Sequence, residues 1–312
     1  MEEKMALFNK PRIVSVSRRT DIPAFYGEWF MQRVRKGWTL SHNPFSHRVL
    51  RVSLRPEDVG AFVFWSKNFA PFLPYLAELK TLGYKMTFLY TLTGLPGVFE
   101  GRVPDAEVTV STFRAISKMF SPRHIQWRYD PILLTSVTDE KFHLRRFRDL
   151  CRRLGGYTTR CYISFVNLYP KVERRLQALE KKGVKLLSVP EAEQAALAQR
   201  LAEIAAEHGI ELYSCCNDHL VGGWVKKARC VDAELLAALF GLEVGLYRIK
   251  PTRKQCGCYE SVDIGTYDTC PHGCIYCYAN AGSKAGKNYL HHGPNSPALI
   301  SRGNSLMDTT SD

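Results

Sequence analysis

Residues 12–21 read RIVSVSRRTD, a short β-branched run that ends in two arginines, a threonine and an aspartate. Similar apolar runs recur along the chain, and stretches of helical period separate most of them. This alternation is typical of βα units, in which helices connect successive parallel strands. The sequence therefore predicts an α/β fold, a full or partial (β/α) barrel of the TIM type.

The predicted elements fill most of residues 12–216. We expect strands at residues 12–17, 49–54, 61–65, 85–91, 124–129, 160–166 and 210–214, and a further short strand within 258–265. We expect helices at residues 23–36, 71–82, 105–120, 139–154, 171–182 and 190–208. This divides the chain into a barrel core (1–214), a cysteine-rich segment (215–280) and a polar, loosely ordered C-terminal tail (281–312), in which His291 and His292 are expected to be solvated.

Polar side chains follow most of the predicted strands. In a parallel barrel the carboxyl ends of the strands converge on one mouth, where active sites lie. The candidates for a polar ring at this mouth are Arg19, Asp21, Lys67, Arg128 and Asp130, and Trp65, Asn68 and Asn167 are candidates for cofactor contacts. The alternative is that these are ordinary polar βα loops.

Three cysteines, Cys270, Cys274 and Cys277, lie in one short loop at the spacing of a three-thiolate iron–sulfur ligand set. A [4Fe-4S] cluster normally takes four thiolates, so three leave one iron open for another ligand. Structural zinc is the alternative, but it needs four ligands, and His272 would have to close a cramped chelate ring.

A second set of cysteines precedes this loop. It consists of Cys215 or its neighbour Cys216, together with Cys230, Cys256 and Cys258. Four thiolates can complete a second [4Fe-4S] cluster or a tetrahedral zinc site, and free cysteines without a metal are a third interpretation.

Composition and charge narrow the class of protein. The formal charge of +13 is compatible with a nucleic-acid partner, although exposed helix faces also account for much of it. The beginning of the chain has no apolar leader run, and no stretch approaches the roughly 18 apolar residues of a membrane span. We therefore expect a cytoplasmic protein without a membrane partner, whose thiols stay reduced and available to metals.

The CxxxCxxC spacing, with Tyr276 just before the last cysteine, resembles that of the S-adenosylmethionine radical enzymes. The resemblance implies that the open iron chelates the amino and carboxylate groups of S-adenosylmethionine, and it makes Tyr276 a candidate cofactor contact. It also implies an oxygen-sensitive enzyme with a flavodoxin- or ferredoxin-like reducing partner and a small-molecule or nucleic-acid substrate. A zinc or iron–sulfur protein that binds nucleic acid without catalysis is the alternative.

Several segments together resemble a family known only as domain of unknown function 1848. They read SVSRRTDIPAFYGEWF, FVFWSKN, TLTG, WRYDPI, CGCYESVDIGTYDTCPHGCIYCYAN and HHGPNSPALI. The resemblance implies a radical S-adenosylmethionine-like protein with its cluster motif at the C-terminal end, and it favours Cys215 over Cys216 as a ligand. In most such enzymes the cluster loop follows the first strand, so a loop after the last strand implies a permuted barrel or a C-terminal segment folded over the mouth.

Overall fold

The computed structural model describes residues 10–46 and 48–300, and a parallel sheet forms its centre. The eight strands lie in the order β10-β1-β4-β5-β6-β7-β8-β9, and each pairs with its neighbours in parallel. The strands are β1 (Arg12–Val16), β4 (Val59–Ser66), β5 (Met86–Thr91), β6 (Ile125–Ile132), β7 (Arg160–Phe165), β8 (Glu211–Ser214), β9 (Val225–Lys227) and β10 (Val262–Asp263). The α/β prediction is confirmed.

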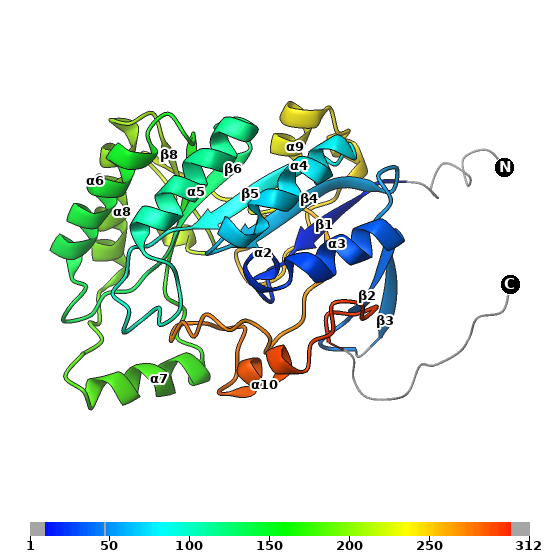
Figure 1. Cartoon of the computed structure of the whole chain (residues 1–312). Helices are drawn as coiled ribbons and strands as arrows, with labels where there is room; N and C mark the ends of the chain where they lie inside the picture. The colour runs from blue at the N-terminus through cyan, green and yellow to red at the C-terminus, as the bar shows by residue number, and fades with distance from the viewer. Residues whose placement is uncertain (1–9, 47, 301–312) are drawn as a thin grey trace, which may run out of the picture.

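Helices connect most of these strands, as the alternating pattern predicts (Figure 1). They are α2 (Ile22–Phe25), α3 (Gly27–Lys36), α4 (Leu73–Thr81), α5 (Ala106–Met119), α6 (Glu140–Leu154), α7 (Pro170–Glu180), α8 (Glu191–Ala206), α9 (Ala233–Phe240) and α10 (Lys284–Leu290). Aspartates begin four of them, α2, α5, α6 and α9, by accepting a bond from a backbone N–H of the first turn. At α5 and α6, Asp105 accepts from Val108 at 2.9 Å and Asp139 from Phe142 at 2.8 Å. Short 3₁₀ turns lie at Ala70–Phe72, Asp218–Leu220 and Val244–Leu246.

The sheet is open rather than closed. Strand β10 pairs with β1 at one edge and β9 pairs with β8 at the other, so within the described residues the two edges do not meet. The full barrel, one of the two predicted forms, is therefore not found. Val14 lies opposite Val262, which places the last strand of the chain beside the first.

The predicted strand at residues 49–54 has a different partner from the one expected. Strand β3 (Val49–Ser53) pairs antiparallel with β2 (Trp38–His42) in a separate two-stranded sheet. Its outer residues Val49 and Leu50 are exposed, which suits a hairpin better than a central parallel strand. The periodicity predicted the strand but not its partner.

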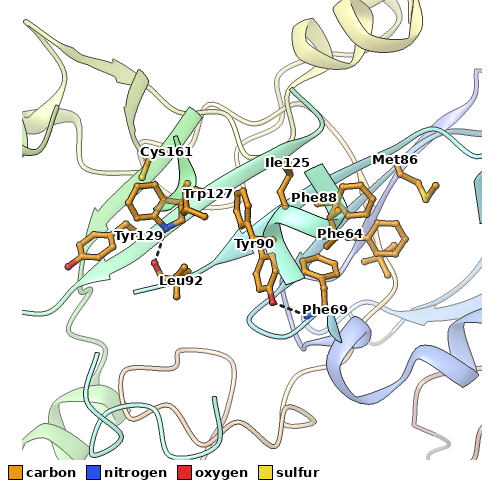
Figure 2. Close-up of a cluster of buried hydrophobic side chains, with 14 of the residues drawn as sticks. Phe64, Phe69, Met86, Phe88, Tyr90, Leu92, Ile125, Trp127, Tyr129 and Cys161 are labelled. Atoms are coloured by element: carbon orange, nitrogen blue, oxygen red, sulfur yellow. Dashed lines mark hydrogen bonds between the residues drawn. The ribbon is translucent and has the colours of Figure 1, made fainter. Parts of the chain in front are cut away.

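Alternation along the strands gives the sheet two different faces. Phe62 and Phe64 of β4 pack with α3, α4, α5, α6 and α8 on what we call the helix face. Figure 2 shows its aromatic row, in which Trp127 Nε1 donates to the Leu92 carbonyl at 2.8 Å. Val63 and Trp65 point to the opposite side, the cysteine face, where they pack against α9 and the cysteines between 215 and 258. The second cysteine set thus forms part of a core.

The C-terminal segment is more ordered than a loose tail. It contains α10, and His292 Nδ1 lies 2.8 Å from the Leu299 carbonyl while its ring packs against Tyr26. The expectation of a solvated residue is therefore wrong for His292, whereas His291 is exposed. Residues 301–312 of the predicted tail lie outside the described residues. In the described part of the chain, no helix has the length and apolar character needed to cross a bilayer.

Candidate functional site

The loop with Cys270, Cys274 and Cys277 runs along the edge of the sheet at which the strands end (Figure 1). Residues 264–269 connect it to β10, and backbone hydrogen bonds join it to the segment after β5. The Ile275 N–H donates to the Phe99 carbonyl at 3.0 Å, and the Arg102 N–H donates to the His272 carbonyl at 3.0 Å. We call residues 270–280 the motif loop.

Asp21, predicted for the polar ring, connects three parts of this edge. Its carboxylate accepts from the Ala24 N–H at 3.0 Å, which begins α2, and from Ser66 Oγ at 2.6 Å and the Lys67 N–H at 2.8 Å at the end of β4. Its Oδ2 also lies 2.8 Å from His272 Nε2 in the motif loop. One carboxylate therefore fixes the ends of β1 and β4 against the cysteine loop.

Glu100 makes a second connection to the motif loop. Its Oε1 accepts from Lys67 Nζ and Thr93 Oγ1, both at 2.8 Å, and from the Tyr276 hydroxyl. Burial opposes ionisation of this carboxyl, but the Lys67 ammonium and the donated hydrogen bonds hold its pKa below the usual range. Lys67 also lies over the Tyr276 ring, 5.5 Å from its centroid. The predicted residues Lys67 and Tyr276 are therefore brought together.

Arg175 of α7 braces the motif loop from outside. Its guanidinium donates to the carbonyls of Cys274 at 3.5 Å, Ile275 at 2.9 Å and Cys277 at 3.0 Å, and also to the carbonyl of Asn280. Arginine has the planar fork needed for several acceptors at once, which lysine lacks. Nothing in the sequence indicated this role, because Arg175 lies in a charged helix typical of a solvated face.

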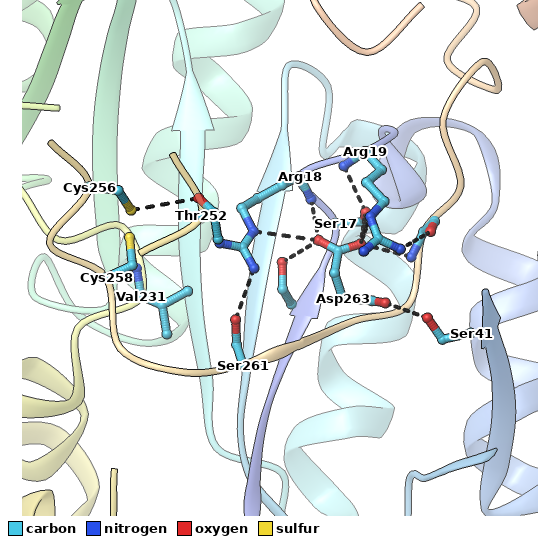
Figure 3. A network of polar contacts seen from close by, with 12 residues as sticks. Ser17, Arg18, Arg19, Ser41, Val231, Thr252, Cys256, Cys258, Ser261 and Asp263 are labelled. Carbon is cyan, nitrogen blue, oxygen red and sulfur yellow. Dashed lines mark hydrogen bonds and ion pairs between the residues drawn. The ribbon is translucent and has the colours of Figure 1, made fainter. Parts of the chain in front are cut away.

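Asp263 of β10 is the centre of a buried polar network (Figure 3). It accepts from Ser15 Oγ at 2.8 Å, Ser17 Oγ at 2.6 Å and the Arg18 N–H at 2.8 Å. Although burial disfavours the charged form, the guanidinium groups of Arg18 and Arg19 hold its pKa below the usual range. Arg19, predicted for the polar ring, also donates to the Gly265 carbonyl at 3.3 Å. The network joins β1 to β10 just before the motif loop.

The remaining predicted residues separate into two groups. Arg128 pairs with Asp130 and lies 5.1 Å from the centroid of the Trp65 ring, so these three residues meet on the cysteine face. The Asn68 side chain makes a local hydrogen bond, in which its Oδ1 accepts from the Ala70 N–H at 3.1 Å. Asn167 lies in the loop after β7, where its carbonyl accepts from the Tyr169 N–H. The structure therefore does not arrange all the candidates as one ring.

The motif-loop thiols differ in burial. Cys274 is buried, whereas Cys270 and Cys277 are half-buried. Burial raises the pKa of Cys274 to about 12, and burial with the nearby Asp21 carboxylate raises the pKa of Cys270 well above its usual value. Both are protonated as free thiols, so a cation that binds them must displace protons.

Five cysteines of the second set are in mutual contact. Cys215 Sγ lies 3.8 Å from Cys216 Sγ and 3.6 Å from Cys230 Sγ. Further thiol contacts join Cys216 to Cys256, Cys230 to Cys258, and Cys256 to Cys258. Cys216 has φ of 58°, a left-handed conformation that glycine or asparagine adopts more readily.

Hydrogen bonds from Cys216 and Cys230 lower the pKa of Cys215, and Arg253 and Arg128 act in the same direction. Arg253 Nη2 donates to Cys215 Sγ at 3.8 Å. Buried soft sulfur beside a cation is the donor chemistry of a thiolate metal site.

Neither set has assembled metal-binding geometry. Among the described residues, no group of three or more His, Cys, Asp or Glu side chains is arranged to hold a metal ion. The sulfur separations of 3.6 and 3.8 Å nevertheless match the edge, about 3.8 Å, of a tetrahedron with metal–sulfur bonds of about 2.3 Å. The second set therefore fits thiolate coordination by chemistry and pairwise spacing. The motif loop fits it by ligand type and by its position at the strand ends.

Sequence comparison identifies the family. The sequence model described as "Domain of unknown function (DUF1848)" matches residues 13–279, which include both cysteine sets. The chain belongs to this family. None of the curated proteins compared with the chain matches it. The family match thus covers nearly all of the parallel sheet and most of the motif loop, while its description names no activity.

Proposed function

We propose that this chain is a radical S-adenosylmethionine enzyme, in which Cys270, Cys274 and Cys277 hold a [4Fe-4S] cluster with one open iron. When bound, such a cluster supplies one electron that breaks a carbon–sulfur bond of S-adenosylmethionine, giving methionine and a radical that takes a hydrogen atom from the substrate. The observation that carries the proposal is the contact between the motif loop and the strand ends. Asp21, predicted as a mouth residue, binds His272 of the loop.

The chain's own residues position this chemistry. Asp21 and Arg175 hold the motif loop from its two sides, and Lys67 with Glu100 fixes Tyr276. Burial of the surrounding strand ends limits the access of water, which a carbon radical requires. In this proposal Asp21 and Lys67 act beside the motif loop, Arg19 acts beside β10, and Arg128 and Asp130 act on the cysteine face. Trp65, Asn68, Asn167 and Tyr276 are the proposed cofactor contacts.

A partial, permuted barrel is the finer form of the fold that we propose. The motif loop follows β10, the last strand in sequence, yet β10 lies at the edge of the sheet beside β1. A strand that follows the rest of the chain thus takes the place that a first strand would have. In the same proposal the core (1–214), the cysteine-rich segment (215–280) and the C-terminal segment (281–312) share one mouth.

We also propose a metal centre at the second set, with Cys215, Cys230, Cys256 and Cys258 as ligands. A second [4Fe-4S] cluster is the form predicted from the sequence. A single tetrahedral ion such as zinc is the second candidate, and the sulfur separation of 3.6 Å between Cys215 and Cys230 favours it. In a cubane each thiolate binds a different iron, which sets the sulfurs further apart.

Iron, sulfide and zinc analysis of anaerobically purified protein tests the cofactor assignment. About eight irons and eight sulfides per chain support two cubanes, and about four of each with one zinc support the mixed form. A colourless protein with zinc alone overturns the proposal and favours the alternative, a non-catalytic zinc protein that binds nucleic acid through its basic surface.

The activity is tested with reconstituted protein, S-adenosylmethionine and dithionite under anaerobic conditions. We expect 5′-deoxyadenosine from the wild type and from Cys151→Ala, a buried cysteine of α6 outside both sets, but not from Cys277→Ala. Equal product from all three proteins contradicts the proposal. In the cell the electron comes, in this proposal, from a cytoplasmic flavodoxin- or ferredoxin-like partner, and exposure to oxygen abolishes activity.

A further inference from the structure

Three buried N–H groups without an acceptor lie together on the cysteine face. Among the described residues, six buried side-chain nitrogen or oxygen atoms lack a hydrogen-bond partner, and three of these are Arg18 Nη1, Trp65 Nε1 and Arg128 Nε. Each of the three is a donor only. Buried polar groups normally have partners, so an exception calls for a missing water, ion or ligand.

These donors come from the ends or interiors of three strands of the parallel sheet, β1, β4 and β6, with β5 lying between β4 and β6. Arg18 follows β1, Trp65 lies in β4 and Arg128 in β6, and both guanidinium groups lie against the same indole ring. The Arg18 and Arg128 carbons Cζ lie 5.9 and 5.1 Å from the ring centroid of Trp65, whose side chain is only 7% exposed. Two cations beside one ring repel each other unless an anion lies near them.

Arginine side chains outnumber carboxylates at this place. Asp263 is shared by Arg18 at 3.7 Å and Arg19 at 3.9 Å, so one carboxylate serves two arginines. Arg128 pairs with Asp130, but its Nε remains without a partner. Arg253 adds a further cation beside Cys215. An anionic group would therefore balance charge as well as accept hydrogen bonds.

The donors lie between the two cysteine sets. Arg18 interacts electrostatically with Cys230 and Cys258 of the second set, and Figure 3 shows its guanidinium between the Asp263 network and the thiols of Cys256 and Cys258. On the other side, the Tyr278 hydroxyl donates to the Arg18 carbonyl at 2.8 Å. Tyr278 directly follows Cys277 in the motif loop. A molecule bound by Arg18 and Arg128 would therefore lie next to this loop.

We infer that Arg18, Trp65 and Arg128 bind an oxyanion, a carboxylate or phosphate, carried by the substrate. This inference rests on the proposed function. In that proposal the carboxylate of S-adenosylmethionine chelates the open iron, so the cofactor has no other oxyanion for these donors. The acceptor must then come from the second molecule in the site, and the substrate is an acidic molecule anchored at its oxyanion.

The test is a calorimetric titration of the anaerobically reconstituted protein, saturated with S-adenosylmethionine, with inorganic phosphate and separately with acetate. We expect one anion per chain to bind saturably, and the tighter of the two identifies the substrate group as phosphate or carboxylate. Arg18→Gln, Arg128→Gln and Trp65→Phe should each weaken it by about tenfold or more, as expected for loss of a hydrogen bond to a charged group.

Trp65→Phe keeps an aromatic six-membered ring and both arginines but removes the N–H together with the five-membered ring, so it stays informative if an arginine variant fails to fold. Arg33→Gln is the matched control, because Arg33 also has a buried Nε without a partner and lies 5.9 Å from the Trp38 ring, but on another part of the fold. Its anion affinity should equal that of the wild type.

Several results overturn the inference. The first two are the absence of saturable anion binding and an equal anion affinity in the wild type and the three variants. The other two are displacement of the bound anion by S-adenosylmethionine and anion binding by the metal-free protein alone. The last two assign the donors to the cofactor and to the metal centre. Production of 5′-deoxyadenosine without substrate is measured separately, so failure of the proposed function and failure of the anion site are distinguished.

Discussion

The two cysteine sets of this chain are built in opposite ways. The motif loop carries three cysteines within residues 270–277, and side chains from distant segments hold the loop: Asp21, Glu100 and Arg175. The second set collects its thiols from three segments, around residues 215–216, 230 and 256–258, and these thiols touch one another. In the first set, side chains from other segments hold the cysteine loop in place, whereas in the second set the cysteines themselves pack together in the core.

This difference in construction indicates which role each cysteine set is suited for. Cys270 and Cys277 are half-buried at the strand ends, as a centre that exchanges a ligand or substrate requires. Cys215, Cys230, Cys256 and Cys258 are all buried within the apolar cluster of the cysteine face, as in a closed structural site. The comparison therefore predicts that the motif loop governs activity and the second set governs stability.

The largest expected effect is on activity at the motif loop. Cys274→Ala should lower 5′-deoxyadenosine formation by about 1000-fold or more, because the proposed cofactor supplies the whole of the reaction. The midpoint temperature of thermal unfolding should fall by less than about 3 °C, because other side chains hold the loop in place. Product assays and calorimetry on the same preparation check both parts. A large loss of stability with retained activity would reverse the assignment of the two sets.

The next effect is on stability at the second set. Cys230→Ala should lower the free energy of unfolding by about 3 kcal/mol or more, because it removes a ligand that joins β8 to the segment before α9. Denaturant titration measures this change, with Cys161→Ala as a control cysteine that is buried in β7 outside both sets. If the two variants are equally stable, the second set holds no structural metal.

Arg175 should have a smaller effect, limited to the motif loop. Arg175→Lys replaces a guanidinium that reaches four carbonyls by a single ammonium. Loss of a group that orients metal ligands typically costs about 10- to 100-fold in metal affinity. Release of iron to a chelator under anaerobic conditions measures it. Arg174→Lys changes the exposed neighbour on the same helix and should leave release unchanged. Equal release from both variants would show that the loop holds its own shape.

Local patterns predicted much of the fold, because strand and helix periodicity are local properties. Helix α6, expected at residues 139–154, begins at Glu140 behind the Asp139 cap and ends at Leu154. Partners along the sheet are not local, which is why residues 49–54 were assigned to the barrel instead of a hairpin with β2. The same limit explains why both a full and a partial barrel were predicted, since nothing in the sequence of a strand shows whether the two edges of the sheet meet.

The site was predicted where its residues follow a spacing or a strand end. Cys270, Cys274 and Cys277 form a motif, and Asp21 and Lys67 end predicted strands. Glu100 and Arg175 were missed because their role depends on contacts far along the chain, such as the 176 positions between Glu100 and Tyr276. One signal could have identified Asp263, because a carboxylate within a short apolar strand indicates a buried hydrogen-bonding partner.

The smallest expected effect is a pH dependence confined to the motif loop. The folded pKa of Glu100 lies below its usual range, so its contribution to stability is complete above the unfolded pKa of about 4.3 and is lost as the pH falls through the lower, folded value. In metal-free protein, the protection factor of the Ile275 amide, which donates to the Phe99 carbonyl, should therefore fall as the pH is lowered below about 4.3.

The Tyr259 amide, which donates to the Val231 carbonyl in the second region, is the internal reference and should change less. Glu100→Gln removes the titrating group and should abolish the difference between the two amides over the same pH range. If both amides lose protection together in the wild type, the loop and the second set open as one unit. The contrast between a braced loop and a core built from cysteines would then hold for their construction but not for their energetics.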